Sequence, residues 1–153
     1  MMLLLRLIDH PLVSWKHKMN KFKLDPRLKN DCFILSESEQ FLILLMNNSL
    51  VPWFILVPKT DKTELYELDG ATHTQVFNVI NQISNFVANE FKPDKLNVAA
   101  IGNIVSQMHI HIIGRYKSDA YWPGVVWGAA EKKVYNSIEA DKIKMRLNKV
   151  LVL

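Results

Sequence analysis

Residues 97–115 read NVAAIGNIVSQMHIHIIGR, and this stretch decides the fold. Within it, three polar residues alternate with three apolar ones over residues 107–112. On a β-strand this alternation puts Gln107, His109 and His111 on one face and the apolar side chains on the other. We therefore predict a strand with one face toward the core and one face available for chemistry.

A second strand is predicted immediately upstream, over residues 97–101. The Gly102-Asn103 pair that follows is a turn signal, so we expect the two strands to form an antiparallel hairpin. This hairpin would place Asn103 beside the histidines, and Asn97 could reach the same face. Two histidines at this spacing are equally explained as solvated or core-edge residues of an antiparallel sheet, so the spacing alone leaves both interpretations open.

Three more strands are predicted upstream. Apolar runs at residues 32–35, 41–46 and 53–57 are separated by polar or turn clusters, a pattern typical of an antiparallel meander. Before them, Asp25-Pro26 predicts a turn that continues as a loop to residue 31, because proline fixes φ and lacks a backbone donor.

One long helix is predicted between the strands. Apolar residues recur at spacings of three and four over residues 76–87, the stripe of an amphipathic helix that Asp69 can cap and that ends before Pro93. A shorter turn of helix is expected over residues 63–67, behind a capping box at Asp61-x-x-Glu64. His73 lies off the stripe, so we assign it to the surface.

A second capping box, Asn136-x-x-Glu139, predicts a C-terminal helix with Ile143, Leu147 and Leu151 on one side. The elements together predict an α+β fold. We expect an antiparallel sheet of about five strands, with the long helix packed on one face and the histidines exposed at the sheet.

Composition limits the class of protein. The 153 residues fit one domain, and 49% hydrophobic and 22% charged residues exclude a disordered or collagen-like chain. The charge of +4 favours anionic ligands, but the lysines are scattered, so a nucleic-acid partner is not indicated. A single cysteine, Cys32, fits a reducing, cytoplasmic compartment. The apolar residues 1–7 are too few to span a bilayer and lack a cleavage site, so no membrane anchor or signal peptide is expected.

The sequence around the histidines resembles the histidine triad (HIT) superfamily of nucleotide hydrolases and transferases. QMHIHIIGR, residues 107–115, is similar to the family's His-x-His-x-His motif followed by two apolar residues, with Gln107 replacing the first histidine. That glutamine and the tail DAYWPGVVWG, residues 119–128, resemble a bacterial branch of proteins similar to diadenosine tetraphosphate hydrolases. LMNNS at residues 45–49 and VPWFILVP at residues 51–58 resemble the same branch.

The resemblance covers roughly residues 20–130. It implies a single HIT-like domain at residues 19–153, preceded by an N-terminal extension at residues 1–18. It also implies a homodimer that pairs through the long helix and the strand nearest to it.

The resemblance further implies a covalent mechanism without a metal or another cofactor. A neutral imidazole is a competent nucleophile, and a backbone carbonyl can hold its second nitrogen. His109, at the middle position, would attack the α-phosphate of a nucleoside phosphoramidate or dinucleoside polyphosphate and form a nucleotidyl-histidine that water hydrolyses. His111 would stabilise charge on the phosphate. Gln107 cannot shuttle protons near neutral pH, but its amide can orient His109 or bind a phosphate oxygen.

Further candidates for substrate binding are three asparagines and two tryptophans. Asn103 matches a position that hydrogen-bonds a phosphate oxygen, Asn97 could reach the same face, and Asn47 matches a position that touches the ribose. Each asparagine is also explained as a turn or strand-end residue bound to local backbone. Trp122, and Trp127 beside it, could close the pocket over a base, or the loop could pack for stability alone.

Two other functions remain open. His-x-His on a strand is also a metal-ligand pattern, but a metal-dependent hydrolase needs a third ligand, and Asp119 falls in the following loop. A non-catalytic nucleotide-binding HIT module is the other alternative, because Gln107 departs from the triad. The sequence specifies neither the physiological nucleotide nor the leaving group.

Overall fold

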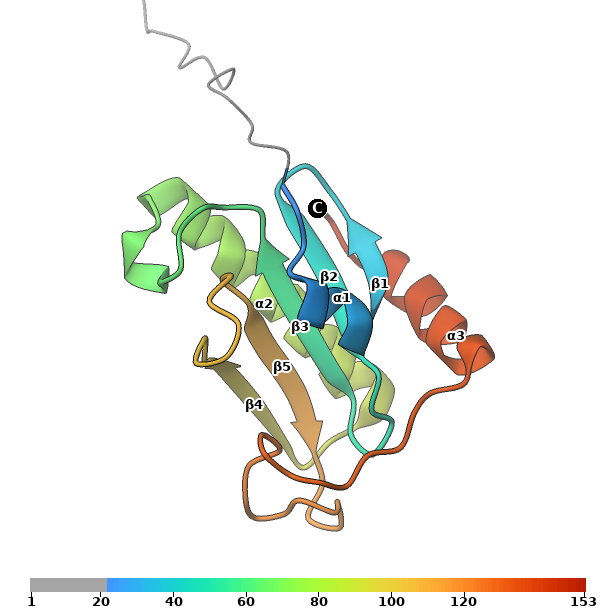
Figure 1. Ribbon diagram of the computed structural model, residues 1–153. Coiled ribbons are helices and arrows are strands. Elements are labelled where there is room, and N and C mark those ends of the chain that lie inside the picture. Colours follow the sequence, from blue (N-terminus) through green and yellow to red (C-terminus); the bar gives the residue numbers. More distant parts are fainter. Residues whose placement is uncertain (1–21) are drawn as a thin grey trace, which may run out of the picture.

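The computed structural model describes residues 22–153. The expected extension at residues 1–18, and with it the apolar residues 1–7, lies outside the described residues. In chain order (Figure 1) the elements are α1 (Pro26–Asp31), β1 (Cys32–Glu37), β2 (Phe41–Met46), β3 (Trp53–Pro58), the 3₁₀ turn η1 (Leu65–Glu67), α2 (Gly70–Phe91), β4 (Lys95–Ala100), β5 (Ile110–Arg115) and α3 (Ser137–Asn148). In this part of the chain no helix has the length and apolar character needed to cross a membrane.

The strands form one five-stranded sheet in the order β1-β2-β3-β5-β4, and every neighbouring pair is antiparallel. The predicted α+β class and antiparallel sheet are therefore confirmed. The predicted hairpin is also present, with Asn97 opposite Ile113 and Ala100 opposite Ile110. Its connection, however, is the long loop of residues 101–109 rather than a tight turn at Gly102-Asn103.

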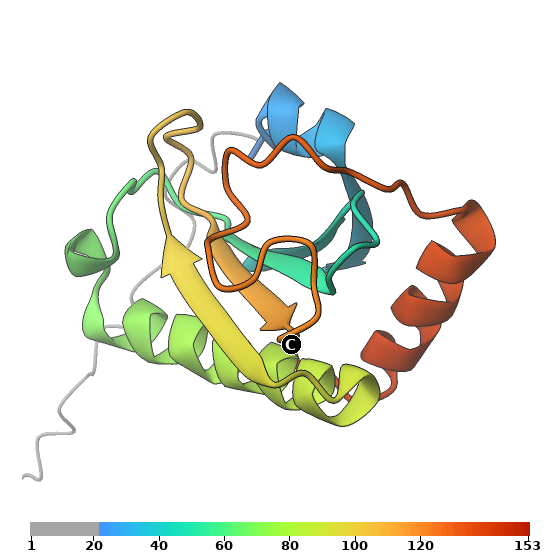
Figure 2. The ribbon, with the colours of Figure 1, turned by 90° about the horizontal axis from the view of Figure 1, so that it is seen from below.

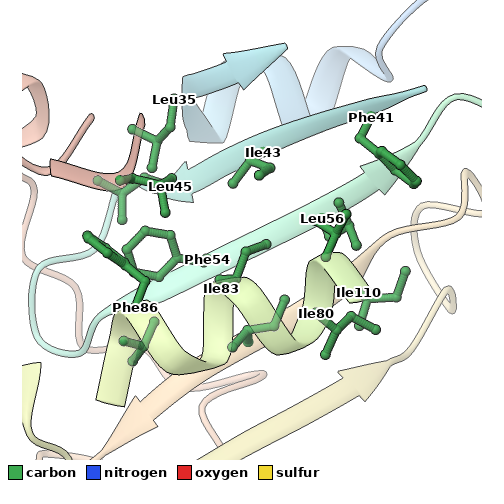
Figure 3. Packing of buried hydrophobic residues seen from close by; sticks show 14 of the residues in the cluster. Leu35, Phe41, Ile43, Leu45, Phe54, Leu56, Ile80, Ile83, Phe86 and Ile110 are labelled. Carbon is green, nitrogen blue, oxygen red and sulfur yellow. The ribbon is translucent and has the colours of Figure 1, made fainter. Parts of the chain in front are cut away.

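Alternate residues of the central strands separate into two cores, one on each face of the sheet, as strand pleating requires. We call the first the helix face, because α2 and α3 cover it (Figures 2 and 3). Its strand residues include Ile43, Phe54, Leu56, Ile110 and Ile112. We call the second the loop face, because α1 and the chain after β5 cover it. Its residues include Leu28, Leu44, Trp53, Ile55, Ile113, Tyr121 and Val126.

The predicted helix stripe is confirmed, because the buried residues of α2 are Val76, Val79, Ile80, Ile83, Phe86 and Val87. The side chain of Asp69 caps the helix by accepting a hydrogen bond from the backbone N–H of Thr72. After Phe91 the chain adopts a left-handed conformation at Lys92, with φ of 49°, which ends the helix before Pro93. The capping box of α3 is also confirmed, with Asn136 and Glu139 bonding reciprocally.

Two local predictions are wrong. Pro26–Asp31 is a short helix rather than a loop, because proline is tolerated in a first helical turn and the Asp25 side chain accepts the Arg27 N–H. The turn before α2 is a 3₁₀ turn whose capping box joins Glu64 and Glu67, not Asp61 and Glu64.

Candidate active site

A cleft of about 620 Å³ opens on the loop face of the sheet. His109, His111 and Trp53 line it from the sheet and its approach, Asn103 lines it from the 101–109 loop, and Trp127 lines it from the chain after β5. Pockets that bind small molecules commonly have volumes of about 300 to 1,000 Å³. The cleft is therefore large enough for a nucleotide-sized ligand.

Both histidines lie deeper than we expected. We predicted that they would be exposed at the sheet, but His109 is 7% exposed and His111 is 4% exposed. The ring of Trp127 packs edge-on against His111 at 5.3 Å between centroids, and Trp53 does so at 5.6 Å. The tryptophans therefore take much of the space that solvent would otherwise occupy.

His109 lies just before β5, and a backbone group holds its ring. The Nδ1 atom is 2.7 Å from the carbonyl oxygen of Gln107. A carbonyl oxygen only accepts, so Nδ1 must carry the proton of this hydrogen bond. In the neutral ring, Nε2 then has a free lone pair, and it has no hydrogen-bond partner within residues 22–153. This is the arrangement that a nucleophilic imidazole needs.

His111 lies in β5, and its ring is held by a side chain. The indole Nε1–H of Trp53 donates to Nδ1 of His111 at 2.9 Å. Strand register explains this contact: Trp53 is opposite Ile113, so His111 is its diagonal neighbour, within reach of an aromatic side chain. Trp53 was not predicted as a site residue, because this contact depends on the pairing of two strands that are far apart in the sequence.

The two imidazoles are neighbours, with 4.9 Å between ring centroids. Burial, and to a lesser extent the proximity of His109, lowers the pKa of His111 to about 3. His111 is therefore neutral near physiological pH, and it would meet a ligand as an uncharged hydrogen-bonding group.

Gln107 does not share the cleft with the histidines. Its side-chain oxygen accepts from the backbone N–H of Asp25 at 2.9 Å, and its amide nitrogen donates to the carbonyl of Lys23 at 3.0 Å. The strand begins only at Ile110, and the chain bends at Gln107, so the alternation that places His109 and His111 together does not extend to residue 107. The expected contact of the Gln107 amide with His109 or with a phosphate is therefore corrected: this amide fastens the segment before α1.

Only one of the three candidate asparagines lines the cleft. Asn103 does so, from the loop before the histidines. Asn97 lies on the loop face but accepts a hydrogen bond from Nη1 of Arg115 at 3.1 Å. Asn47 accepts the backbone N–H of Tyr135 at 2.9 Å and so fastens the segment before α3.

Asn48, the neighbour of Asn47, was not predicted as a site residue. Asn48 lines the cleft, and its side-chain amide donates to the hydroxyl of Tyr121 at 2.8 Å. The Tyr121 hydroxyl in turn donates to the carbonyl of Glu131 at 2.7 Å. In the LMNNS motif the second asparagine, not the first, therefore builds the cleft wall.

The two tryptophans of the loop also differ in position. Trp127 lines the cleft, and its Nε1 is buried without a hydrogen-bond partner among the described residues. Trp122, the tryptophan that we selected for closing the pocket, lies outside the lining, where the guanidinium of Arg115 stacks 5.8 Å from its ring centroid.

A buried ion pair fixes the start of this loop. The Asp119 carboxylate accepts from Nε and Nη2 of Arg115 at 2.8 and 3.0 Å, and the two side chains are 1% and 2% exposed. Asp119 also accepts the backbone N–H groups of Tyr116 and Tyr121. Burial alone would raise the pKa of the Asp119 carboxyl, but these hydrogen bonds and the charge of Arg115 outweigh it and hold the pKa below its ordinary value. The pair positions the chain that carries Trp127 over the histidines.

Within residues 22–153 there is no group of three His, Cys, Asp or Glu side chains that could hold a metal ion. Asp119 in particular is occupied by Arg115, so it does not complete a site with the histidines.

Comparison with known proteins shows which family the chain belongs to. Residues 27–118 match the family model described as the HIT domain. The HIT protein of Bacillus subtilis is 33% identical over 79 residues, which are 48% of this chain and 53% of that protein, so the chain spans about half the length of this relative.

Similar solved structures cover more of the chain. A histidine triad protein from Marinobacter aquaeolei is 38% identical, with a TM-score of 0.79 over 85% of this chain and 96% of its own. Histidine triad proteins from Bradyrhizobium japonicum and Sinorhizobium meliloti are each 32% identical, with TM-scores of 0.81 and 0.82. The first match covers 86% of this chain and 98% of the other, and the second covers 88% and 100%.

Proposed function

The chain belongs to the HIT domain family, and we propose that it is a nucleotide hydrolase or nucleotidyl transferase that acts at an α-phosphate through a covalent nucleotidyl-histidine. Its substrate is a dinucleoside polyphosphate or a nucleoside phosphoramidate. We also propose that it is cytoplasmic and belongs to the bacterial Gln-x-His-x-His branch, with proteins similar to diadenosine tetraphosphate hydrolases.

The observation that carries this proposal is the hydrogen bond between Nδ1 of His109 and the carbonyl of Gln107, at 2.7 Å. It fixes the ring tautomer, so the lone pair is on Nε2, which has no partner in the described part of the chain. His109 and His111 both line the cleft, so the α-phosphate can contact a nucleophile and a neutral ring together.

In the first step, the Nε2 lone pair of His109 forms a bond to the α-phosphorus. The bond from phosphorus to the leaving group breaks, and its electron pair goes to the leaving oxygen or nitrogen. The ring becomes positively charged, and the hydrogen bond from Nδ1 to the Gln107 carbonyl stabilises that charge. In the second step, water attacks phosphorus, releases a proton to solvent and forms a nucleoside monophosphate, while the P–N electron pair returns to Nε2.

Because residue 107 is a glutamine, we expect the enzyme to prefer leaving groups that need no proton. Its amide bonds to the backbone of Lys23 and Asp25, and an amide does not titrate near neutral pH, so this position supplies no proton. A phosphate chain can leave as a stable anion, whereas an amine must gain a proton to leave. We therefore expect dinucleoside polyphosphates to react faster than phosphoramidates.

A rapid-quench experiment tests the covalent intermediate. Full-length protein is mixed with diadenosine tetraphosphate labelled at the α-phosphate, in the presence and absence of a chelator, and quenched within the first turnover in an alkaline denaturant, in which a phosphoramidate bond survives. We expect label on His109, its loss on mild acid treatment, and no effect of the chelator. The matched His109→Ala variant should carry no label. Turnover without protein-bound label in the wild type, together with loss of activity in chelator, would overturn the proposal in favour of a metal-bound water as the nucleophile.

A non-catalytic nucleotide-binding module is the second candidate, and the position of Gln107 outside the cleft is the observation that favours it. The same experiment separates the two. Tight binding of the nucleotide with neither label nor product would identify a binding module.

We also propose that the protein forms a homodimer through β4, which is an edge strand of the sheet. The apolar stripe of α2 is already buried in the chain's own core, so the surface left for a partner is Val98 on β4 and Phe77 on α2, which are 48% and 43% exposed. An edge strand also has unpaired backbone groups that a second copy can bond. Light scattering at micromolar concentration should give twice the chain mass, and a monomer mass at all concentrations would contradict this proposal.

A further inference from the structure

The two histidines of the cleft are held by different kinds of partner. The carbonyl oxygen of Gln107 can only accept, so it requires a proton on Nδ1 of His109. The indole N–H of Trp53 can only donate, so it requires a bare Nδ1 on His111, with the two atoms 2.9 Å apart. The two neighbouring rings are therefore held in opposite tautomers.

An indole N–H restricts the protonation of a histidine ring more strictly than a hydroxyl or an amide partner does. A hydroxyl or an amide can turn and reverse its hydrogen bond when the ring changes its protonation, but an indole nitrogen has no acceptor form. A proton on Nδ1 of His111 would bring two N–H groups face to face between buried residues. Trp53 therefore opposes both the other neutral tautomer and the charged imidazolium.

We propose that Trp53 is a positioning residue that holds His111 as the neutral Nε2–H tautomer, so that a fixed, uncharged N–H donor faces a ligand in the cleft. This inference rests on the proposed function for its role in turnover, in which the donor bonds a non-bridging oxygen of the α-phosphate. Nε2 of His111 has no partner among residues 22–153, so it is available for that bond.

The surroundings of His111 support this assignment. His109 is the titratable side chain in direct contact with it. The charged residues that line the same cleft are Arg27, Asp31, Glu131 and Lys132, and none of them is hydrogen-bonded to the His111 ring. Burial lowers the pKa of this ring, which agrees with the preference of Trp53 for the neutral form.

The test measures the tautomer directly in the free, full-length protein. Long-range ¹H–¹⁵N correlation spectra identify which ring nitrogen of each histidine carries a proton. In the wild type we expect a bare Nδ1 and a protonated Nε2 at His111, unchanged between pH 8 and pH 5. At His109 we expect the reverse assignment at pH 8. A scalar coupling between the Trp53 Nε1–H and His111 Nδ1 should be visible across the hydrogen bond. A proton on Nδ1 of His111 would overturn the proposal without any variant.

Trp53→Phe removes the donor and keeps an aromatic ring. We expect His111 to populate both tautomers and to titrate closer to the ordinary histidine range. The kcat should fall by roughly ten- to a hundredfold with little change in KM, less than the loss expected when a whole oxyanion donor is removed. If His111 in this variant keeps the wild-type tautomer and titration, Trp53 is not the positioning group and the proposal fails.

Trp127→Phe is the matched control. Trp127 also packs edge-on against His111, at 5.3 Å, and against Trp53, at 6.1 Å, but it donates no hydrogen bond to either. This variant should leave the His111 tautomer as in the wild type, and a change equal to that of Trp53→Phe would show that packing sets the tautomer. The spectra need no substrate, so the two proposals can fail separately. A wild type with the expected tautomers, but with neither label on His109 nor nucleotide product, would overturn the proposed function and leave this inference standing.

Discussion

The two faces of the sheet are closed in different ways. On the helix face, α2 and α3 bury hydrocarbon against hydrocarbon, and the buried side chains in contact there are apolar. On the loop face, irregular chain covers the sheet, and buried polar contacts hold that chain: Arg115 with Asp119, Asn48 with Tyr121, and Trp53 with His111. The cleft with His109 and His111 lies on the loop face.

This difference has a physical reason. A helix satisfies its own backbone hydrogen bonds and needs only an apolar stripe to pack. A loop that covers a core must find partners for its polar groups, so side chains such as Asn47 and Asn48 supply them. The loop face can therefore include a cleft lined by polar groups, among them Asn48, His109 and His111.

The largest effect should come from the histidines on the loop face. His109→Ala removes the proposed nucleophile, and we expect kcat to fall by at least roughly ten-thousandfold, as in enzymes that lose a residue of the catalytic unit. His111→Ala removes one hydrogen-bond donor, which should cost roughly a hundred- to a thousandfold. Single-turnover kinetics with labelled substrate measure both losses. Equal losses in the two variants, with chelator-sensitive wild-type activity, would identify both residues as metal ligands.

On the helix face the largest loss should be in stability. Phe54 is fully buried, with Phe86 and Phe91 packed edge-on against it (Phe54 and Phe86 are labelled in Figure 3). Phe54→Ala should lower the free energy of unfolding by about 3 to 5 kcal/mol, because it loses apolar burial and leaves a cavity. Urea denaturation measures this change. Tyr66→Ala is the control, because Tyr66 is 86% exposed and should change stability by less than about 0.5 kcal/mol. Similar losses in both variants would mean that Phe54 is not a core residue.

A smaller loss of stability should follow from breaking the ion pair on the loop face. Asp119→Asn leaves the Arg115 charge buried without its partner, which should cost about 3 kcal/mol. Glu37→Gln breaks the surface pair with Lys59 and is the control, with a cost below about 1 kcal/mol.

The stabilisation by the Asp119 carboxylate should depend on pH. Because the pKa of Asp119 in the folded protein lies below its ordinary value, this stabilisation is fully present above the ordinary value and is lost as the pH falls toward the folded-state pKa. The difference in the free energy of unfolding between the wild type and Asp119→Asn should therefore become smaller at acid pH. A difference that stays constant down to the acid limit of folding would contradict this account.

The helix face was largely predictable from sequence, and the loop face was not. The spacing of the apolar residues in α2 and the continuous apolar runs of β2 and β3 are both visible in the local sequence. The bond between Trp53 and His111 depends on the register of two strands that are far apart in sequence, which no local pattern contains. The positions of Asn47 and Asn48 also could not be predicted locally, because both bond to the distant segment before α3, at Tyr135 and Lys133. The alternation over residues 107–112 predicted one shared face for Gln107, His109 and His111. The structure brings the two histidines together in the cleft but not Gln107, because the strand begins only at Ile110.

The smallest effect should come from Gln107, and it decides whether the first triad position acts on the loop face at all. Its amide makes two hydrogen bonds to the backbone of Lys23 and Asp25, so Gln107→Ala should lower stability by about 1 to 2 kcal/mol. The kcat should change by no more than a few-fold, because the side chain does not line the cleft. Gln107→His is the sharper variant. It restores the triad histidine, yet its ring would lie against the segment before α1, where it cannot reproduce both amide bonds, so it should also be less stable and no more active. Thermal unfolding and steady-state kinetics on the three proteins measure both properties. A gain of tenfold or more in kcat for Gln107→His would mean that residue 107 reaches the substrate, and the division between an anchoring glutamine and two working histidines would be wrong.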